Sequence, residues 1–416
     1  MNDWKEIRLG DVIRIKSGLP YKGEYLNKGD NYLLGMGCVS FTETFLTNGA
    51  RHYSDEGKPQ YIGKPGDIVL ATRQQSDKMP ILGMPAIIPD ILNSAKIIVG
   101  SNLYMVENSS DIDNKFIFWL LRNPNYINHI KNSQTGTTVR MITKKDIENF
   151  TFLCPSKHEQ GFISSLLWNI QNKIETNRKI NARLEEMAQA IFKSWFIDFT
   201  PFGGQMPEEW EEKSLINMVE IVKGGDWGKE EELGSYVKRV LCIRGADLKN
   251  IKVGEKGNAP TRYILEKNFN QKYLSNHDII VEISGGSPTQ STGRIAMISS
   301  SILDENDNSI VCTNFCKALK IKKPYYFYFY YLWNYLYDNK IMFIYENGSN
   351  GIKNLNLTNL LERENHPIPS EKIALDFYNM VESIFIKIQN LGKESARLAE
   401  LRDTILPKLM SGEIKV

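Results

Sequence analysis

The amino-acid sequence repeats itself once, and this repeat limits the possible folds more than any other feature. Near the end of each copy, Ala182-Arg-Leu-Glu-Glu recurs as Ala396-Arg-Leu-Ala-Glu. Matches that keep their order at a long period are the signature of repeated structural units, so we expect two copies of one module in the 416 residues. The two copies begin with matching positions, which are Trp4, Leu9, Ile15 and Gly18 in the first and Trp210, Leu215, Ile221 and Gly224 in the second.

Both copies follow the same internal plan. Short β-rich runs come first, such as Asp67-Ile-Val-Leu-Ala and Lys96-Ile-Ile-Val, and Gly, Pro and Asn turns separate them. One short aromatic helix is predicted next, at residues 115–121 and again at 325–337. After Pro155 and Pro369 the hydrophobic period changes to about 3.5, which predicts a helix of about forty residues in each copy.

Each of these long helices carries a heptad pattern. Two apolar seams over five heptads predict a coiled coil, and at 1.5 Å per residue each helix would be roughly 60 Å long. The first seam holds Ile163, Ile170, Asn177, Leu184 and Ile191, then Phe377, Ile384, Leu391, Leu398 and Ile405. The companion seam holds Leu167, Ile174, Asn181, Ala188 and Trp195, then Val381, Ile388, Ser395, Arg402 and Leu409.

Asn177 and Asn181 interrupt the seams near the middle of the first helix. A buried Asn costs stability unless its amide finds a partner, and it commonly fixes the register of a coiled coil. Alternatively, these residues are exposed where the two helices splay apart. The sequence favours neither interpretation over the other.

These patterns predict an α+β protein with two mixed α/β domains in tandem repeat, joined by two long antiparallel coiled-coil spacer helices. Because a whole second module follows the first helix, the natural partner of that helix is the second helix of the same chain. The predicted boundaries are 1–156 for the first domain, 157–198 for the first spacer helix, 199–369 for the linker and second domain, and 370–416 for the second spacer helix and tail.

Composition excludes several classes of protein. With 42% hydrophobic and 24% charged residues the chain has the balance of an ordinary globular protein, and its net charge is only +2. Five scattered cysteines and isolated histidines predict neither a disulfide framework nor a metal site. The start of the chain lacks the pattern of a signal peptide and no apolar run is long enough to cross a membrane, so we expect a cytoplasmic location and no membrane contact.

The motifs that could indicate an enzyme are weak. Asn123-Pro-Asn-Tyr126 resembles the catalytic motif of adenine methyltransferases, but the second proline is missing and no glycine-rich cofactor loop precedes it. The Ser284-Gly-Gly-Ser287 loop lacks the lysine of a phosphate-binding loop. We therefore expect no catalytic residues and no bound cofactor.

Recognition has better support, because both copies place polar, glycine-containing loops at matching positions. Arg, Gln, Asn, Ser and Thr side chains read base edges or hold phosphates, although on composition alone such loops are more often plain turns. In the first copy the candidate DNA-binding residues are Lys22, Arg73, Gln74, Gln75, Lys78, Gln134, Thr137, Thr138 and Arg140. In the second copy they are Trp227, Lys229, Ser284, Ser287, Thr289, Gln290, Thr292, Arg294, Ser349, Asn350 and Lys353.

The aromatic run from Tyr325 to Trp333 has two interpretations. It could form a platform on which bases stack. The matching segment of the first copy, residues 116–121, is simply apolar, and this favours a packed core helix in both copies.

The chain resembles, over its whole length, a specificity (S) subunit of a type I restriction-modification system. The features that carry the resemblance are the tryptophan start with Leu9-Gly-Asp, the Ser284-Gly-Gly-Ser loop, Asn354-Leu-Asn-Leu before Pro367-Ile-Pro-Ser, and the ending Leu401-Arg-Asp-Thr-Ile-Leu-Pro-Lys-Leu-Met-Ser-Gly-Glu-Ile. The ending is the most specific of these matches. The first copy departs from the usual loop pattern, since Arg73-Gln-Gln-Ser-Asp-Lys replaces the glycine-serine run.

The resemblance implies that each domain is a target-recognition domain that reads half of an interrupted sequence in double-stranded DNA. It also implies that the helices set the gap and dock two methyltransferase (M) subunits, with restriction (R) subunits joining that core. A protein of this kind catalyses nothing alone. The other hypotheses are a self-contained modification enzyme and a coiled-coil nucleic-acid-binding adaptor or scaffold without restriction partners.

Overall fold

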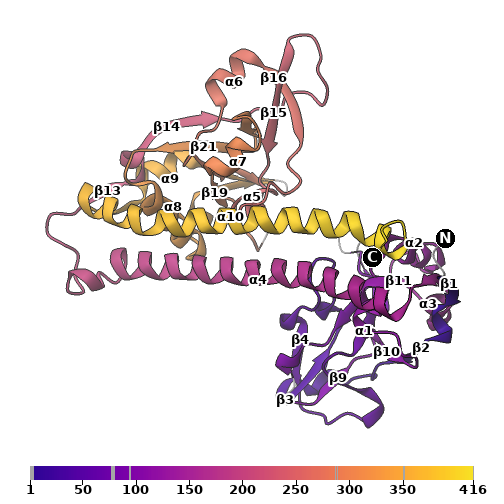
Figure 1. Cartoon of the computed structure of the whole chain (residues 1–416). Coiled ribbons are helices and arrows are strands. Elements are labelled where there is room, and N and C mark those ends of the chain that lie inside the picture. Colours follow the sequence, from indigo (N-terminus) through magenta and orange to yellow (C-terminus); the bar gives the residue numbers. More distant parts are fainter. Residues whose placement is uncertain are drawn as a thin grey trace. The chain divides into compact units, whose positions relative to one another are not determined.

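The computed structural model describes residues 4–75, 80–92, 95–285, 287, 289–349 and 352–415, with the side chains of Ser349 and Ile352 left out. The chain divides into two compact units (Figure 1). The first unit contains residues 1–175 and 397–416, and the second contains residues 176–396. Each unit has one mixed α/β domain, and each also contains a part of both long helices.

The first unit is built on two four-stranded sheets and a terminal strand pair. One sheet is antiparallel and has the order β2 (Ile13–Ser17), β10 (Leu103–Asn108), β6 (Ile68–Ala71) and β8 (Pro85–Ile87). The other has the order β4 (Ala50–Tyr53), β3 (Leu26–Leu34), β9 (Ile97–Val99) and β5 (Ile62–Gly63), and β3 and β9 run parallel. The terminal pair is β1 (Lys5–Arg8) with β12 (Thr151–Cys154).

The second unit repeats this arrangement with one strand fewer in its second sheet. The first sheet has the order β14 (Val219–Gly224), β21 (Cys316–Ile321), β17 (Ile279–Glu282) and β19 (Ile295–Met297). The second has the order β16 (Thr261–Leu265), β15 (Tyr236–Ile243) and β20 (Ile310–Cys312), and β15 and β20 again run parallel. The terminal pair is β13 (Glu211–Ser214) with β24 (Asn365–Ile368).

The central strands of both units are buried on both faces. All four residues of β6 (Ile-Val-Leu-Ala) and of β17 (Ile-Ile-Val-Glu) are buried, so these strands read as continuous apolar runs and not as an alternating pattern. The shorter helices complete the two domains. They are α1 (Asn114–Leu120), α2 (Pro124–Ser133) and α3 (Lys144–Glu148) in the first unit, and α5 (Leu248–Ile251), α6 (Glu266–Lys272), α7 (Ser300–Asp304), α8 (Tyr326–Asp338) and α9 (Leu357–Arg363) in the second.

The aromatic run forms a core helix and does not form a stacking platform. In α8 every residue from Phe327 to Trp333 is at most 3% exposed. The tyrosine hydroxyls that reach the edge of this core find partners, since Tyr328 donates to the Pro367 carbonyl. Burial raises the pKa of Tyr328 and Tyr330, so both remain neutral.

The two long helices are α4 (Lys157–Phe196) and α10 (Glu371–Met410). They pair in antiparallel fashion within each unit. In the first unit Gln171 accepts a hydrogen bond from Arg402, and in the second Asn177 and Asn181 reach Glu394 and Ile388. The first predicted seam is buried or half-buried at every position, namely Ile163, Ile170, Asn177, Leu184, Ile191, Phe377, Ile384, Leu391, Leu398 and Ile405.

The asparagines of the seam are buried, so the interpretation that they are exposed where the helices splay apart is wrong. Asn177 and Asn181 are 0% and 6% exposed. Asn177 Nδ2 donates to Glu394 Oε2 at 2.8 Å, and Asn181 Nδ2 donates to the Ile388 carbonyl at 3.1 Å. These two bonds fix which residues of α10 lie beside α4, because a shift in register would leave both amides without a partner.

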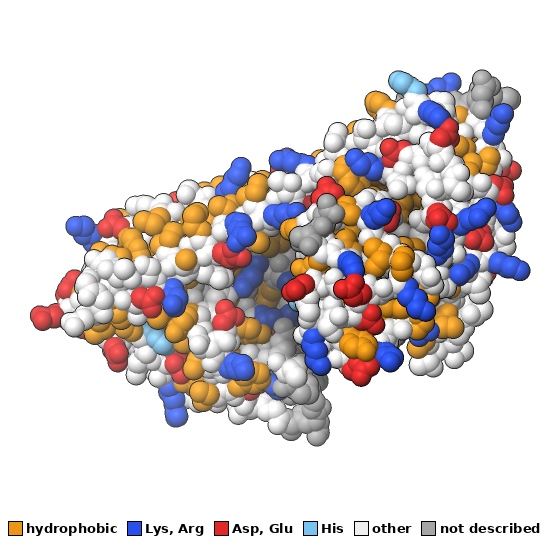
Figure 2. Space-filling model, turned by 90° about the horizontal axis from the view of Figure 1, so that it is seen from below, with side chains coloured by type: hydrophobic (Ala, Val, Ile, Leu, Met, Phe, Trp, Pro, Cys, Tyr) orange, Lys and Arg blue, Asp and Glu red, His pale blue; other side chains and the backbone are white. Residues whose placement is uncertain are grey.

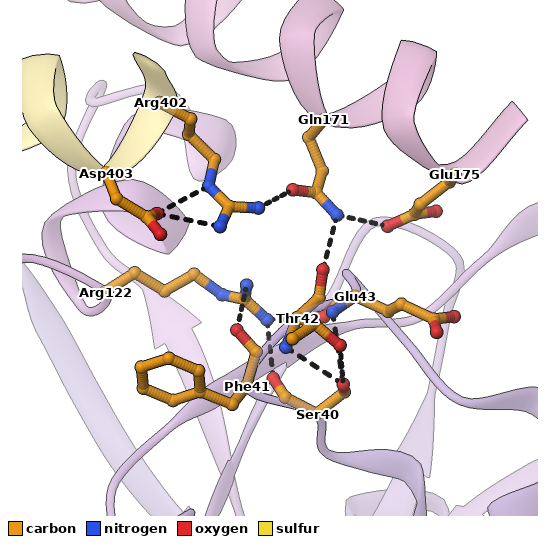
Figure 3. A network of polar contacts seen from close by, with 9 residues as sticks. All are labelled: Ser40, Phe41, Thr42, Glu43, Arg122, Gln171, Glu175, Arg402 and Asp403. Carbon is orange, nitrogen blue, oxygen red and sulfur yellow. Dashed lines mark hydrogen bonds and ion pairs between the residues drawn. The ribbon is translucent and has the colours of Figure 1, made fainter. Parts of the chain in front are cut away.

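In the first unit, a loop of the domain is seated on the helices by a buried polar network (Figure 3). Gln171 Nε2 donates to the Thr42 carbonyl at 2.9 Å, and the Thr44 amide donates to Glu175 Oε1 at 2.7 Å. Arg122 donates to the carbonyls of Ser40, Phe41 and Glu43. Burial, with Arg402 close by, lowers the pKa of Arg122 to about 9, so its guanidinium stays charged at neutral pH.

In the second unit, neutral side chains bind the loop at residues 251–254 to helix α10. Gln389 Nε2 donates to the Lys252 carbonyl at 3.0 Å, and Ser299 Oγ donates to Gln389 Oε1 at 2.9 Å. Gly392 is required at the contact, because a Cβ there would lie 1.6 Å from the Val253 carbonyl oxygen. When Ala182 is aligned with Ala396, Gln389 occupies the position of Glu175, since each lies seven residues before its alanine.

The alignment of the two copies needs one correction. Strand β14 has a bulge between Val219 and Ile221, and β2 has no such shift. The extra residue moves the alignment by one, so Gly18 corresponds to Gly225 and not to Gly224. Both glycines make the same close approach, since a Cβ on Gly18 would meet the Gly100 carbonyl and a Cβ on Gly225 would meet the Thr313 carbonyl.

Candidate nucleic-acid interface

In the first unit, a short strand pair brings together two of the predicted polar loops, which lie far apart in the sequence. Strand β7 (Arg73–Gln74) pairs with β11 (Arg140–Met141), so that Gln74 lies opposite Arg140. A tight turn leads into β11, because Thr135 and Met141 exchange two backbone hydrogen bonds and Gly136 has φ 93°. Thr137 and Thr138 are exposed on this turn, and Gln134 caps the end of α2.

The second unit has the equivalent arrangement with one more strand. Strand β18 (Ser284–Gly285) pairs with β23 (Ile352–Leu355), which also pairs with β22 (Glu346–Ser349). Ser284 lies opposite Asn354, and Gly285 lies opposite Lys353. Both units therefore present one polar ribbon made from two distant parts of the sequence.

Several predicted residues have exposed side chains on or near these ribbons. Arg73, Gln75 and Lys22 are exposed in the first unit. In the second unit Ser287 is half-buried and closes a turn by accepting from the Gln290 amide at 3.0 Å, which leaves Thr289 and Gln290 exposed. Lys229 is also exposed, and its ammonium lies 5.6 Å from the centre of the Tyr236 ring.

Other predicted residues already have partners inside the protein. Gln74 is 7% exposed, and its Oε1 accepts from the Leu82 amide at 3.3 Å. Thr292 is 0% exposed and donates to Glu346 Oε1 at 2.9 Å, while Lys353 forms an ion pair with Glu346 Oε2 at 3.0 Å. These side chains hold the ribbons in shape, which is a positioning role.

Arg294 makes the most extensive of these internal contacts. Its Nε and Nη2 donate to the two oxygens of Glu282, at 2.7 and 2.5 Å. The hydrogen bonds to Glu282 raise the pKa of Arg294, so its guanidinium stays charged. Glu282 is 4% exposed, and this buried pair fixes the end of β17 beside the ribbon.

Trp227 lies at the mouth of a cavity that the sequence did not reveal. The cavity has a volume of about 390 Å³ and is lined by Trp227, Arg244, Gly245, Ala246, Glu282, Ser284, Thr313, Asn314 and Phe315. Phe315 and Trp227 are 63% and 38% exposed. The sequence gives no signal for Phe315, because a phenylalanine directly before a strand is usually buried, and only its exposure distinguishes it.

Three predicted residues cannot be placed. Lys78 and Asn350 lie outside the described residues, and the side chain of Ser349 is not described. Within the described part of the chain, no group of three or more His, Cys, Asp or Glu residues is arranged to hold a metal ion. Among the same residues no helix is long and apolar enough to span a membrane.

Charges of both signs are mixed on one face of the molecule. On the face drawn in Figure 2, Lys and Arg side chains are interspersed with Asp and Glu side chains. This agrees with 51 basic and 49 acidic residues in the whole chain. On this face the cations do not form one large basic surface, and an anionic partner would meet individual cations instead.

Comparisons with known proteins place these features in a family. The family described as "Type I restriction modification DNA specificity domain" matches residues 1–186 and 207–377. The type I restriction enzyme MjaIX specificity subunit of Methanocaldococcus jannaschii is 23% identical over 452 residues, which cover 100% of this chain and 94% of that protein. The HindI specificity subunit of Haemophilus influenzae is 25% identical over 492 residues, which cover 100% of both chains.

A solved structure shares the fold. The crystal structure of a type I restriction-modification system S subunit from M. genitalium matches with a TM-score of 0.62 at 17% identity, over 98% of this chain and 96% of that chain. At this level of identity the likeness establishes the fold alone. It confirms the predicted α+β architecture with two tandem domains and long helices.

Proposed function

We propose, from the premise that the chain belongs to the family of type I restriction-modification DNA specificity domains, that each of its two domains reads one half of an interrupted DNA sequence. The chain is the DNA specificity subunit of a type I restriction-modification complex. The observation that carries the proposal is that the family match falls twice, once on each copy of the repeat. Two reading domains on one chain require a site with two parts.

The polar ribbons are the surfaces that we assign to base reading. Each ribbon places side chains that hydrogen-bond to base edges or phosphates on a short, paired backbone. Arg73 lies on the first ribbon with Gln75 directly after it, and Ser284 lies on the second. Buried partners such as Gln74 and Thr292 keep the backbone of each ribbon in place. Preorganisation of this kind lowers the entropy cost of binding.

The helices are the surface that we assign to the methyltransferase subunits. Met187 of α4 and Leu401 of α10 are 45% and 48% exposed. They occupy the same position of the repeat, because each lies five residues after the alanine of the Ala-Arg-Leu motif. Two equivalent apolar residues suit two identical partners, so we propose that two M subunits bind, one at each.

Docking at these positions can be tested by stoichiometry. Met187→Ser and Leu401→Ser should each remove one M subunit from the purified complex, and the double variant should remove both. Native mass spectrometry measures the result, and Ile91→Ser is the matched control because Ile91 is 75% exposed and lies outside the helices. Retention of both M subunits by the double variant would contradict this assignment.

We further propose that the chain has no catalytic activity of its own. Methylation and cleavage then belong to the M and R subunits, and the chain acts where the genomic DNA lies, in the cytoplasm. S-adenosylmethionine should bind to the purified M subunit but not to this chain alone. A calorimetric titration that finds binding to the isolated chain would contradict the proposal.

Methylation-aware sequencing tests the proposed function as a whole. The chain is expressed with its M subunit in a host that has no other adenine methylation. We expect one bipartite motif, with two short half-sites at a fixed gap. A continuous motif, or methylation without sequence preference, would contradict two-part reading.

A further inference from the structure

The cavity beside Trp227 combines features that a site for a planar polar ring requires. It lies within the second unit, where the ends of β14, β15 and β17 meet the turn between β20 and β21. Trp227 and Phe315 supply aromatic surface, and the volume of about 390 Å³ is in the range of sites for small ligands. Exposed aromatic rings at a cavity mouth are costly to leave in water, which favours an occupant that stacks on them.

The Thr313 hydroxyl in the cavity wall has only a weak partner inside the protein. Thr313 is 3% exposed, and its Oγ1 forms no conventional hydrogen bond to a nitrogen or oxygen of the described residues. Its contact is the Cys316 thiol, and a thiol is a weak hydrogen-bonding group. Burial raises the pKa of this thiol to about 12, and the contact with Thr313 opposes that rise only in part. A ligand that hydrogen-bonds to the buried hydroxyl offers it a stronger partner than the thiol.

Glu282 offers a second polar contact in the same wall. Arg294 donates one hydrogen bond to each carboxylate oxygen. Since each oxygen has two acceptor sites, the pair keeps capacity to accept from an N–H group. The glycine at position 245 leaves this carboxylate uncovered, because a Cβ there would lie 2.5 Å from Glu282 Oε1.

The first unit has different residues at three of these positions. Phe315 corresponds to Asn102, since their carbonyls accept from the matching amides of Ile283 and Thr72. Glu282 corresponds to Ala71, and Thr313 corresponds to Gly100. These three groups are therefore not part of the scaffold that the two domains share.

We propose that this cavity holds one base of the second half-site, unstacked from the duplex and carrying an exocyclic amino group. The base stacks on Trp227 and Phe315, donates its amino hydrogen to Glu282, and hydrogen-bonds to the Thr313 hydroxyl. The Arg262 guanidinium, 4.1 Å from the centre of the Trp227 ring, holds the indole in position. The inference rests on the proposed DNA-reading function and deepens it.

A base fits these groups better than a side chain of a partner protein. An aliphatic side chain would leave Glu282 and Thr313 without partners, whereas an amino-bearing base has both a ring to stack and an edge to hydrogen-bond. The cavity is also next to the polar ribbon of the second unit, because Ser284 belongs to both. A base from a duplex bound at the ribbon lies within reach.

A mismatch scan of the full complex with M subunits tests the inference. Each base pair of the second half-site is disrupted in turn by changing only the base on the opposite strand. A mismatch at the adenine that the M subunit methylates serves as the reference, because a methyltransferase also unstacks its target base. At one further position the mismatch should tighten binding by about 10-fold or more, because the cost of unpairing has already been met. At the remaining positions a mismatch should weaken binding.

Three variants tie that position to the cavity. Phe315→Ala should abolish the gain at that position, while Phe41→Ala should keep it, because Phe41 is a 51% exposed phenylalanine of the first unit. Thr313→Val should weaken binding by about 3- to 10-fold with little change in the unfolding midpoint, since the hydroxyl that it removes has only a weak thiol partner inside the protein.

The outcomes separate this inference from the proposed function. If the complex binds its motif but no mismatch outside the methylated adenine tightens binding, the inference is overturned and two-part reading stands. If the wild-type complex binds no specific sequence, the proposed function itself fails. If Phe315→Ala loses the M subunit and keeps its motif preference, a protein occupies the cavity and the inference is overturned.

Discussion

The two units have the same strand order, but different polar groups bind a loop of each domain to the long helices. In the first unit Glu175, Gln171 and the buried Arg122 form a charged network around residues 40–44. In the second unit a neutral Gln389 and the close approach at Gly392 hold residues 251–254. The comparison teaches that strand order and helix pairing define the module, while the polar contacts are free to diverge between copies.

The largest expected effect comes from lengthening both helices together, which tests whether the units act as two separate modules. A heptad inserted after Glu175 and another after Ala396 falls where the units divide and preserves the contacts inside each unit. Each insertion adds about 10 Å of helix, which corresponds to about three base pairs. We expect the gap of the methylated motif to grow by that amount while both half-sites stay the same, and methylation-aware sequencing reads the result.

The control for this change is an insertion in one helix alone. One helix is then a heptad longer than the other between the units, so the pairing of Gln171 with Arg402 and that of Asn177 with Glu394 cannot both be kept, and we expect loss of specific methylation. If the double insertion leaves the gap unchanged, the helices do not set the spacing.

The charged network should be more sensitive to loss of one member than the neutral one. Glu175→Ala leaves the Thr44 amide unpaired and removes an acid near two buried arginines, which should cost about 3 kcal/mol. Gln389→Ala removes neutral bonds and should cost about 1–2 kcal/mol. Hydrogen exchange of residues 40–44 and of 251–254 measures each effect locally, and equal effects would remove the distinction between the units.

The smallest expected effects concern two glycines of the long helices. Gly392→Ala should destabilise the second unit by about 1–3 kcal/mol, because its Cβ would meet the Val253 carbonyl. Gly161→Ala should stabilise the first unit by about 0.5–1 kcal/mol, since nothing lies within 4 Å of its Cβ and alanine is the better helix former. Urea unfolding measures the change in the free energy of unfolding for each variant. Changes of the same sign would contradict the account that a loop packs closely against the helix at Gly392 and not at Gly161.

The sequence predicted the features that depend on periodicity. The repeat, the long helices and their inward seams follow from spacing of apolar residues, and the burial of Ile163, Leu391 and their neighbours agrees with that pattern. The fate of Asn177 was left open, because a polar residue in a seam is buried or exposed according to its partner on another helix. Only the position of Glu394 decides it.

Most of the site could not be predicted in the same way. The pairing of Gln74 with Arg140, and of Ser284 with Asn354, joins residues that are far apart in sequence and carry no pairing signal. The bulge in β14 shifts the alignment of the two copies by one residue, and nothing in the amino-acid sequence indicates this shift. The exposure of Phe315 and the burial of Thr313 against a weak thiol partner are visible only once neighbouring side chains are in place.

Exchange of the first domain tests the central claim most directly. Residues 1–156 are replaced by the matching domain of another specificity subunit, the helices and second domain are kept, and the chimaera is expressed with its M subunit for methylation-aware sequencing. We predict that one half-site changes while the gap and the other half-site stay as they are. A motif in which both halves change, or neither does, would contradict a chain in which each domain reads its own half of the DNA site.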